Sequence, residues 1–407
     1  MDDPIAYILL RFPHLTETFI AAEIQAVQAQ GTPVRILSLL PPHPGPVHPT
    51  SQALLSQVEY APPLHSPALW LAQLAAFLSG PRRYLRLLGD LMAPPPPRAV
   101  WRLKRLVVFV KGVALARRLG DAPPRLIHSH FAWLSAAAAL VVSRLLDRPL
   151  TVTAHASDIY SPENDLLCLV AGAASRLITI SEHNRQAIVA RCPAVQGRIA
   201  VVHCGVDRAR FAATQPPPDG PVRILSVGSL TEKKGHEYLI RACRLLRDRG
   251  LDFRCTIVGR GEQQAALERL IAELNVGENV TLAGPLEQPQ VRRALGRSHI
   301  FALACVVARD GDRDGIPVAM MEALAMGLPV VSTSVSGIPE LVRDGETGLL
   351  APPRDPPALA QALARLITDP ALRRRLGQRG QALVAREFDI VVNAARLRSI
   401  FNEVGRL

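Results

Sequence analysis

The amino-acid sequence predicts an α/β protein made of two doubly wound, Rossmann-like domains that face each other across a cleft. Its 407 residues, 48% hydrophobic and 20% charged, suffice for two domains with separate cores. Short apolar segments alternate with helical ones, which is typical of parallel sheets covered on both faces. The alternation occurs twice, on either side of the proline-rich segment 211–221 (FAATQPPPDGP), which we interpret as a linker.

Each domain has its own series of predicted strands. The first domain, residues 1–213, begins with YILLRF (7–12) and a helical stretch from about Glu17 to Gln30. Its further strands are predicted at 34–40, 125–131, 150–155, 177–181 and 199–203. The strands of the second domain, residues 221–387, are predicted at 222–228, 253–259, 279–284, 300–305 and 329–333. Ligands of such sheets bind at the carboxyl ends of the strands, so functional side chains are expected in the strand-to-helix loops.

The net charge of +12 is concentrated in one segment of the first domain. Between Pro81 and Arg125 there are eleven arginines and lysines against two aspartates, a local balance of +9. Large apolar residues are interleaved with them, and LWLAQLAAFL (69–78) lies close by. This pattern predicts helices within 69–118 that lie on an anionic membrane surface, the alternative being a solvated arginine-rich face. Nucleic acid is not expected as a partner, because only 4% of the residues are aromatic and no recognition motif is present.

The expected compartment is the cytoplasm, with peripheral association at the inner face of the membrane. No apolar run approaches the roughly 20 residues needed to cross a bilayer, and the N-terminal MDDPIAY is acidic where a signal peptide is basic. The six cysteines contain no CxxC pair, which favours reduced thiols.

Two loops of the second domain have the composition of a phosphate site. GSLTEKKGHEYLI (228–240) leads from a predicted strand into a helix, whose first N–H groups and dipole favour an anion. The chain has only four lysines, and two of them, Lys233 and Lys234, stand side by side here. We expect Lys234 to contact phosphate and Lys233 to be a solvated loop residue. In IVGRGEQQ (257–264), glycines flank Arg260, whose guanidinium can hold two oxygens of a diphosphate.

The stretch DGDRDGIPVAMME (310–322) opens like an EF-hand calcium loop, with alternating aspartates before a glycine. We reject calcium, because the bidentate Glu should be the twelfth residue, where Met321 stands. Pro317 suits a first helical position, so a helix is predicted to begin there, with Asp314 before it and Glu322 about two turns after Asp314. Two carboxylates around free backbone N–H groups can instead bind the hydroxyl groups of a ribose and a hexose.

These segments resemble the retaining GT-B glycosyltransferases of family 4. DGIPVAMMEALAMGLPVVST followed by SGIPELV is similar to the family's donor site, in which an acid and a Glu are separated by seven residues, as Asp314 and Glu322 are. SVGSLTEKKG resembles the phosphate loop, TAHASDIY the His-Gly-Ser-Asp loop and CGVDRARF the Asn-Gly-Val-Asp hinge. RFPHLTETFI is similar to the start of members that build exopolysaccharides, so the resemblance covers essentially the whole chain.

The resemblance implies a role for each matching residue. Glu322 would bind the ribose of a nucleotide sugar, Asp314 the sugar hydroxyls, and Lys234 the diphosphate. Further donor-binding residues would be Gly228, Ser229, Arg260, Gly315, Ile316, Pro317, Ser336 and Gly337. His155 would face the sugar near the reacting carbon. The acceptor side would comprise His14, Thr16, His130 and Asp158. The segment 388–407 would be the family's last helix, packed back on the first domain.

His128 and His130 share one face of a predicted strand and suggest zinc only weakly, because the sequence identifies no third ligand. We interpret both as structural or as lining the cleft. Four residues depart from the family's pattern. Ser229 stands where the family usually has Arg, Asp314 where many members have Glu, Ala156 where it has Gly and Cys204 where it has Asn. Ser229 removes one phosphate contact that the resemblance implies.

The implied reaction moves a sugar to a hydroxyl of a saccharide or lipid-linked saccharide, with retention, in exopolysaccharide or glycolipid assembly. In the family the leaving phosphate takes the acceptor's proton, so the protein positions the reactants and stabilises charge. No cofactor and no metal ion are expected. The alternatives are a nucleotide-sugar epimerase, a glycosyl phosphorylase of similar fold, and a non-catalytic scaffold at the membrane surface.

Overall fold

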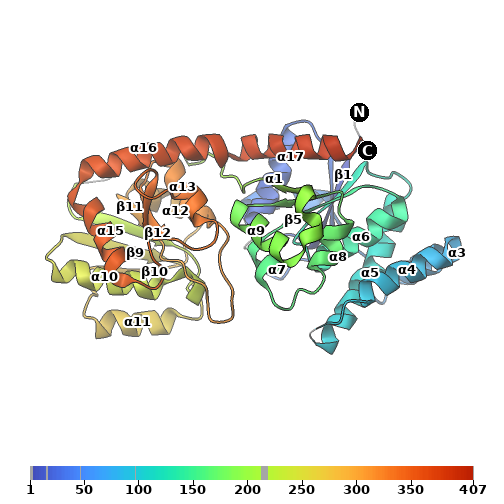
Figure 1. Ribbon diagram of the computed structural model, residues 1–407, viewed down its shortest axis with the longest axis horizontal. Coiled ribbons are helices and arrows are strands. Elements are labelled where there is room, and N and C mark those ends of the chain that lie inside the picture. Colours follow the sequence, from blue (N-terminus) through green and yellow to red (C-terminus); the bar gives the residue numbers. More distant parts are fainter. Residues whose placement is uncertain (1–2, 15–16, 46, 97, 212–218, 407) are drawn as a thin grey trace. The chain divides into compact units, whose positions relative to one another are not determined.

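A computed structural model describes residues 3–14, 17–45, 47–96, 98–211 and 219–406, which form two compact units (Figure 1). Unit 1 is Met1–His203 together with Asn393–Leu407, and unit 2 is Cys204–Val392. Most of the predicted linker at 211–221 lies outside the described residues.

A seven-stranded parallel sheet with the order β3-β2-β1-β4-β5-β6-β7 forms the centre of unit 1. Its strands are β1 (Ile5–Arg11), β2 (Val34–Leu40), β3 (Val58–Tyr60), β4 (Leu126–His130), β5 (Leu150–Ala154), β6 (Arg176–Thr179) and β7 (Ile199–Val201). All six predicted strands are confirmed, and β3 is a short edge strand that the sequence analysis missed. Every residue of β4 and β5 is buried, as expected for strands covered on both faces. The order reverses between β1 and β4, which is where such sheets bind ligands.

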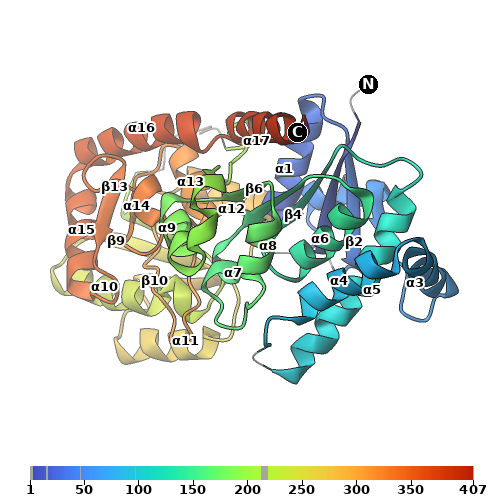
Figure 2. The ribbon, with the colours of Figure 1, turned by 45° about the vertical axis from the view of Figure 1, so that its right-hand side comes forward.

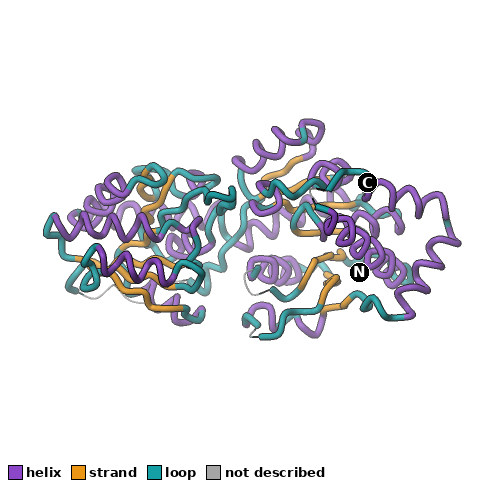
Figure 3. Tube along the Cα trace, turned by 90° about the horizontal axis from the view of Figure 1, so that it is seen from below, coloured by secondary structure: helices purple, strands orange, loops and turns teal. Residues whose placement is uncertain are grey.

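Helices lie on both faces of this sheet, as the tube in Figure 3 shows. They are α1 (Thr18–Ala29), α2 (Pro49–Gln52), α3 (Pro67–Ser79), α4 (Pro81–Met92), α5 (Ala99–Leu119), α6 (Leu134–Leu146), α7 (Ala156–Tyr160), α8 (Leu167–Ala173), α9 (Glu182–Arg191) and α17 (Ile390–Val404). From Asn393 onward α17 belongs to unit 1, where Leu397 and Phe401 are buried in one apolar cluster with Tyr7 and Ile20.

Unit 2 repeats the design with a six-stranded parallel sheet of order β10-β9-β8-β11-β12-β13. The strands are β8 (Val222–Val227), β9 (Phe253–Val258), β10 (Val280–Gly284), β11 (Ile300–Ala302), β12 (Val330–Thr333) and β13 (Gly348–Ala351). The helices are α10 (His236–Asp248), α11 (Gln264–Glu273), α12 (Gln288–Gly296), α13 (Val318–Ala325), α14 (Ile338–Leu341), α15 (Pro356–Thr368) and α16 (Pro370–Glu387). The five predicted strands are confirmed, and β13 was not predicted. Here the order reverses between β8 and β11, and the loops after these two strands carry Lys234 and Asp314.

The expectation that all six cysteines are reduced is wrong. Cys168 in α8 and Cys192 directly after α9 form a disulfide, with 5.4 Å between their Cα atoms and a sequence separation of 24. The pairing depends on how α8 and α9 pack and leaves no local sequence pattern. The other four cysteines are not disulfide-bonded: Cys243, Cys255 and Cys305 are buried, and Cys204 is half-buried.

Helices α3, α4 and α5 pack on one another at one side of unit 1 (Figure 2). They expose large apolar side chains, including Trp70, Leu71, Leu74, Leu78, Leu85 and Leu103. Basic side chains of the same segment are exposed as well, among them those of Arg82, Arg83, Arg86, Arg98, Arg102 and Lys104. Two other basic residues of the predicted segment point inward: Arg105 pairs with Asp165, and Lys111 donates to the carbonyl of Leu39 at 2.6 Å. Among the residues the structure describes, no helix is both long and apolar enough to span a membrane.

Candidate functional site

The loop after β8 is shaped to place Lys234 at the carboxyl end of the sheet. A short 3-10 turn, Glu232–Lys234, leads to Gly235, whose φ of 64° is left-handed. A Cβ at this position would collide with the carbonyl of Ala304, so only glycine fits here. The next residue, His236, is fully buried, and its Nε2 lies 3.2 Å from the carbonyl oxygen of Ser229. Burial lowers the pKa of His236 to about 4, so the ring is neutral at pH 7 and serves to hold the loop.

Lys234 and Asp314 form the central ion pair of unit 2. Their Nζ and Oδ2 atoms are 2.8 Å apart, and the side chains are only 14% and 15% exposed. Burial is the largest single influence and lowers the pKa of Lys234, but the negative charges around it, that of Asp314 foremost, and the hydrogen bond to Asp314 together raise the pKa by more. The pKa therefore lies above its usual value and the ammonium is retained. The thiol of Cys305 lies 3.7 Å from the same carboxylate. The structure therefore brings together two predicted residues that are 80 positions apart.

The other aspartates of the calcium-like stretch do not converge. Asp312 pairs with Lys233 at 2.8 Å, so Lys233 is not the purely solvated residue that was expected. The carboxylate of Asp310 accepts the backbone N–H of Asp312 at 2.9 Å. In the part of the chain that the structure describes, these side chains do not form a three-ligand cluster.

Helix α13 places Glu322 beyond this ion pair. Pro317 has ψ of 127°, outside the helical range, so the helix begins at Val318, one residue later than predicted. Glu322 accepts a hydrogen bond from Gln288 on α12 at 3.0 Å, a partner that the sequence did not reveal. Burial raises the pKa of Glu322 to about 7. Hydroxyl groups that donate hydrogen bonds to this carboxylate would lower the free-energy cost of burying its negative charge.

The remaining predicted donor residues surround these groups. Gly315 accepts the N–H of Gly337 at 3.2 Å, which ties the loop before α13 to the loop before α14, and Ile316 and Pro317 are buried beside them. The backbone of Gly228 lies against the side chain of Lys234. Ser336 has a positive φ of 50°, and its Oγ is buried without a hydrogen-bond partner among the described residues. Ser229 and Arg260 are exposed, and Arg260 is tied to the β8 loop through its carbonyl, which accepts the N–H of Leu230 at 2.9 Å.

Three of the four predicted acceptor residues, His14, His130 and Asp158, line one pocket of about 610 Å³ in unit 1. Thr16 lies outside the described residues. The pocket wall is otherwise largely apolar, with Leu9, Leu10, Leu39, Leu40, Trp101, Leu103, Val107 and Val108. Cationic side chains line it as well, namely those of Arg11, Lys104 and Lys111.

His155 does not line this pocket but contacts it through His130. The ring is 6% exposed, and its Nε2 lies 3.1 Å from Nδ1 of His130. Asp158 accepts the backbone N–H of His155 at 2.8 Å and that of Ala132, which fixes the start of α7. Burial raises the pKa of Asp158 to about 7 and lowers that of His155 well below its usual value. His155 is thus a buried, hydrogen-bonded ring at a strand end.

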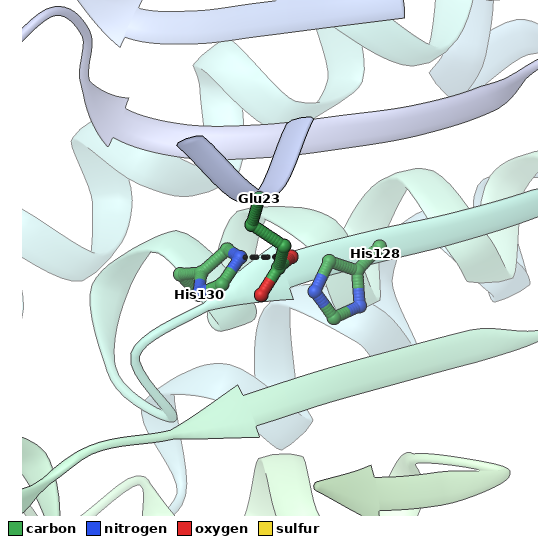
Figure 4. Close-up of side chains that lie close together, drawn as sticks. All are labelled: Glu23, His128 and His130. Atoms are coloured by element: carbon green, nitrogen blue, oxygen red, sulfur yellow. Dashed lines mark hydrogen bonds and ion pairs between the residues drawn. The ribbon is translucent and has the colours of Figure 1, made fainter. Parts of the chain in front are cut away.

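His128 and His130 have a possible third ligand partner in Glu23 on α1 (Figure 4). The sequence alone did not identify this residue. One ligand atom from each of the three lies within 4.8 Å of the others. Glu23 stands more than 100 residues before these histidines, and only the packing of α1 on the sheet brings it close.

We expect Glu322→Gln to stabilise the protein at pH 8 and to change its stability little at pH 5. The folded-state pKa of about 7 lies above the reference value of 4.5, so the wild type loses stability as the pH rises between these values, and the glutamine variant does not. The gain at pH 8 is about 1–3 kcal/mol, and the amide still accepts the bond from Gln288. Thermal unfolding of the ligand-free protein at both pH values measures it. The exposed Glu346→Gln is the control, and equal gains at both pH values would contradict this prediction.

Two family models match the chain. Residues 207–383 match the model "Glycosyl transferases group 1", and residues 16–210 match "Glycosyltransferase Family 4". The chain is 45% identical over 176 residues to the amylovoran biosynthesis glycosyltransferase AmsK of Erwinia amylovora, which is 43% of each chain. It is 31% identical over 323 residues to the D-inositol 3-phosphate glycosyltransferase of Arthrobacter sp. (strain FB24), covering 72% of this chain and 75% of that protein. The match to AmsK thus spans less than half of that protein.

A solved structure of Anabaena Alr3699/HepE in complex with UDP has the same fold. The TM-score is 0.74 at 16% identity, over 98% of this chain and 100% of that one. The predicted fold class, two Rossmann-like domains of the GT-B type, is confirmed.

Proposed function

Because the chain belongs to the group 1 glycosyl transferases of glycosyltransferase family 4, we propose that it transfers a sugar from a nucleoside-diphosphate sugar to an acceptor hydroxyl, with retention of the anomeric configuration. The observation that carries the proposal is the buried pair of Lys234 and Asp314 at the carboxyl end of the unit 2 sheet. A cation and a carboxylate held side by side match two adjacent parts of the donor: the cation matches the diphosphate, and the carboxylate matches the hydroxyls of the sugar.

Lys234 retains capacity for the donor while it is paired. Its ammonium has three N–H donors, and the bond to Asp314 uses one of them, so phosphate oxygens can accept the others. Asp314 has acceptor sites left for sugar hydroxyls, and Glu322 for the ribose. The backbone N–H groups before α13 add positive potential for an anion. With this cationic charge from Lys234 and the backbone, we propose that transfer requires no metal ion.

Chemistry at this site consists of positioning and charge stabilisation. The leaving diphosphate takes the proton of the acceptor hydroxyl as that hydroxyl attacks the anomeric carbon from the same face. We propose for His155 the place beside the reacting carbon that the family resemblance implies. Lys234 stabilises the negative charge that develops on the leaving phosphate.

The pocket of unit 1 supports a lipid-linked saccharide as the acceptor. Its wall of leucines, valines and Trp101 suits an apolar chain, and Arg11 and Lys104 suit phosphate groups next to that chain. Trp101 stacks on Trp133 with 4.6 Å between ring centroids, and the ammonium of Lys104 lies 3.7 Å from the centre of the Trp101 ring. AmsK is named for the biosynthesis of amylovoran, so exopolysaccharide assembly is the process we propose.

Thermal-shift measurements with UDP, GDP, ADP and calcium test the donor site. A nucleotide that binds only the folded protein raises the melting temperature by mass action, and we expect a shift with one nucleotide that Glu322→Ala abolishes. That nucleotide then selects the sugar donors for transfer assays. A shift with calcium alone would contradict the proposal. Turnover without an acceptor would indicate an epimerase, and turnover that depends on free phosphate would indicate a phosphorylase. A protein that binds a nucleotide but shows no turnover would be a scaffold.

We also propose that α3, α4 and α5 bind an anionic membrane surface. Arg82, Arg83 and Arg86 are exposed beside Leu85, which is 56% exposed, as expected of a helix that lies at an interface. Replacing the three arginines by glutamine is expected to lower binding to phosphatidylserine vesicles by about 1 kcal/mol per residue at low salt. Vesicle flotation measures this, and a variant with Arg373, Arg374 and Arg375 of α16 replaced is the control. Equal flotation of both variants would contradict the proposal.

A further inference from the structure

We propose that Glu23, His128 and His130 bind one zinc ion in the interior of unit 1. Zinc is bound in proteins by histidine nitrogens and carboxylate oxygens, and two histidines with one glutamate are a ligand set that known zinc sites use. Among the residues that the structure describes, these side chains are the group of three whose ligand atoms all lie within 4.8 Å of one another. The site belongs to unit 1, while Lys234 and Asp314 belong to unit 2, so the inference does not depend on the proposed function.

The three side chains come together from two elements. His128 and His130 alternate on β4, so both rings lie on the same face of the sheet, and Glu23 reaches this face from α1. Figure 4 shows the carboxylate of Glu23 between the two imidazole rings. The ring centroids are 5.0 Å apart. The carboxylate and the two rings therefore surround one common point, which is where an ion would lie.

The spacing of the ligand atoms suits an ion after a small movement. In a tetrahedral zinc site with bonds of about 2.1 Å, the ligand atoms lie roughly 3.4 Å apart. Oε1 of Glu23 and Nε2 of His130 are 3.0 Å apart, and no pair of ligand atoms has to approach by more than about 1.4 Å. The Glu23 carboxylate can make this movement, because its long side chain is 20% exposed, whereas both histidines are fully buried.

Both histidines have their other ring nitrogen next to a group that can orient the ring. Nδ1 of His130 lies 3.1 Å from Nε2 of His155. Nδ1 of His128 lies 2.9 Å from Oγ1 of Thr151. Histidines that bind a metal ion usually donate the N–H of this second nitrogen to a fixed acceptor. Nε2 of each ring then remains for the ion, which at His128 would replace a long contact of 3.4 Å to the hydroxyl of Thr153.

The surroundings offer charge compensation and a path for the ion. A zinc ion carries two positive charges, and Glu23 compensates one of them. Two further carboxyl groups, those of Glu17 and Asp158, line the same pocket of about 610 Å³ as His130 and can compensate the remaining charge. Because His130 lines this pocket, the ion can reach the site through it.

The ligand types favour zinc over calcium and magnesium. Calcium and magnesium are held by oxygen ligands, whereas two of the three ligands here are imidazole nitrogens, which suit zinc. The calcium measurements proposed for the donor site therefore do not report on this site. The ion would join α1 to β4 and stabilise unit 1, and it takes no part in the proposed sugar transfer.

An ordinary hydrogen-bonded cluster is the alternative interpretation of the same contacts. In that cluster a proton on Nε2 of His130 is shared with Oε1 of Glu23, which also accepts the phenol of Tyr7 at 3.0 Å. Such a cluster would bind zinc no better than other histidines of the protein do. Zinc binding with a stoichiometry of one that depends on Glu23 and on both histidines distinguishes the two interpretations.

The experiment titrates the full, tag-free chain with zinc chloride by calorimetry after treatment with a chelator. We expect one zinc ion per wild-type chain. Glu23→Gln preserves the size of the side chain but removes the charged ligand, and we expect it to lower the zinc affinity by at least about 100-fold. His128→Asn retains an amide near Thr151 but loses Nε2, and the same loss of affinity is expected.

His14→Gln and His43→Gln are the matched controls. Both histidines line the same pocket as His130, and their ring centroids are 6.2 Å apart, but neither belongs to the group of three. Zinc bound adventitiously by accessible histidines would be weakened by these substitutions. We expect both variants to bind one zinc ion with the affinity of the wild type.

Two further measurements identify the ligands and verify folding. X-ray absorption at the zinc edge should show nitrogen and oxygen ligands at about 2.0–2.1 Å and no sulfur at about 2.3 Å, which would exclude the cysteines. The melting temperature should rise with zinc concentration in the wild type and stay constant in Glu23→Gln. Circular dichroism reports whether each variant is folded. If a variant does not fold, the stoichiometry and the absorption spectrum of the wild type decide.

Three results would overturn the inference. The first is a wild-type chain that binds no zinc or binds it without a stoichiometry of one. The second is unchanged zinc affinity in a folded Glu23→Gln or His128→Asn variant. The third is zinc bound through sulfur or lost in the control variants. A chain that binds zinc as expected but transfers no sugar would refute the proposed function alone.

Discussion

Lys234→Ala is expected to lower the turnover number by about 10- to 100-fold. Lys234 makes a charge-assisted contact in a site where its side chain is only 14% exposed, and such contacts contribute about 1.5–3 kcal/mol. The loss should appear mainly in kcat, because the charge on the leaving phosphate grows as the donor bond breaks. Steady-state kinetics with the donor selected by the nucleotide panel measures the effect.

Lys233→Ala is the matched control for this substitution. Lys233 is the neighbouring lysine and pairs with Asp312, but its side chain and its partner are 26% and 43% exposed, so water replaces much of the interaction. We expect less than about a threefold change in kcat for this variant. Equal effects of both substitutions, or near-normal turnover in Lys234→Ala, would refute the phosphate role of Lys234. The double variant Lys234→Ala with Asp314→Ala reports how much of any loss of stability in Lys234→Ala comes from leaving the Asp314 carboxylate unpaired.

Phe401→Ala is expected to destabilise unit 1 by about 3–5 kcal/mol, because it leaves a cavity among fully buried rings. The Phe401 ring centroid lies 5.0 Å from that of His128 on β4 and 6.2 Å from that of Tyr7 on β1. Helix α17 therefore covers the apolar cluster beside these two strands. Denaturant unfolding of the purified chain gives the free energy of unfolding for each variant.

The control for Phe401→Ala lies on the same helix. Val391 is 60% exposed near the start of α17, so Val391→Ala should change the free energy of unfolding by less than about 0.5 kcal/mol. Deleting all residues after Asp389 removes the whole helix and should destabilise unit 1 at least as strongly as Phe401→Ala. A truncated chain with unchanged melting would show that α17 contributes nothing to the core.

Much of unit 2 could be predicted because its pattern is local. Continuous apolar runs mark β8, β9 and β12, and the loop that follows each of these strands can be recognised from the sequence alone. The spacing of Asp314 and Glu322 is set by a loop and a single helix, so both could be proposed from neighbouring residues alone. The same holds for Lys234, whose place between a strand and a helix is visible in the sequence.

The contacts of these residues could not be predicted in the same way. Lys234 meets Asp314 across 80 residues, and Gln288 reaches Glu322 from a different helix. Arg105 and Lys111 belong to the segment 69–118, for which the sequence predicts helices on a membrane surface, but their side chains are turned into the core of unit 1. In each case the partner lies on another element, and its distance depends on how helices pack on the sheet.

The sequence by itself determined the fold class, the positions of the strands and the local motifs of the donor loops, because hydrophobic periodicity and turn chemistry act over a few residues. Only the tertiary structure decided that Glu23 joins His130 and His155, that Cys168 pairs with Cys192, and that a pocket of about 610 Å³ adjoins the predicted acceptor residues. The physical reason is that parallel strands need long crossover connections. These connections bring together residues that share no local pattern.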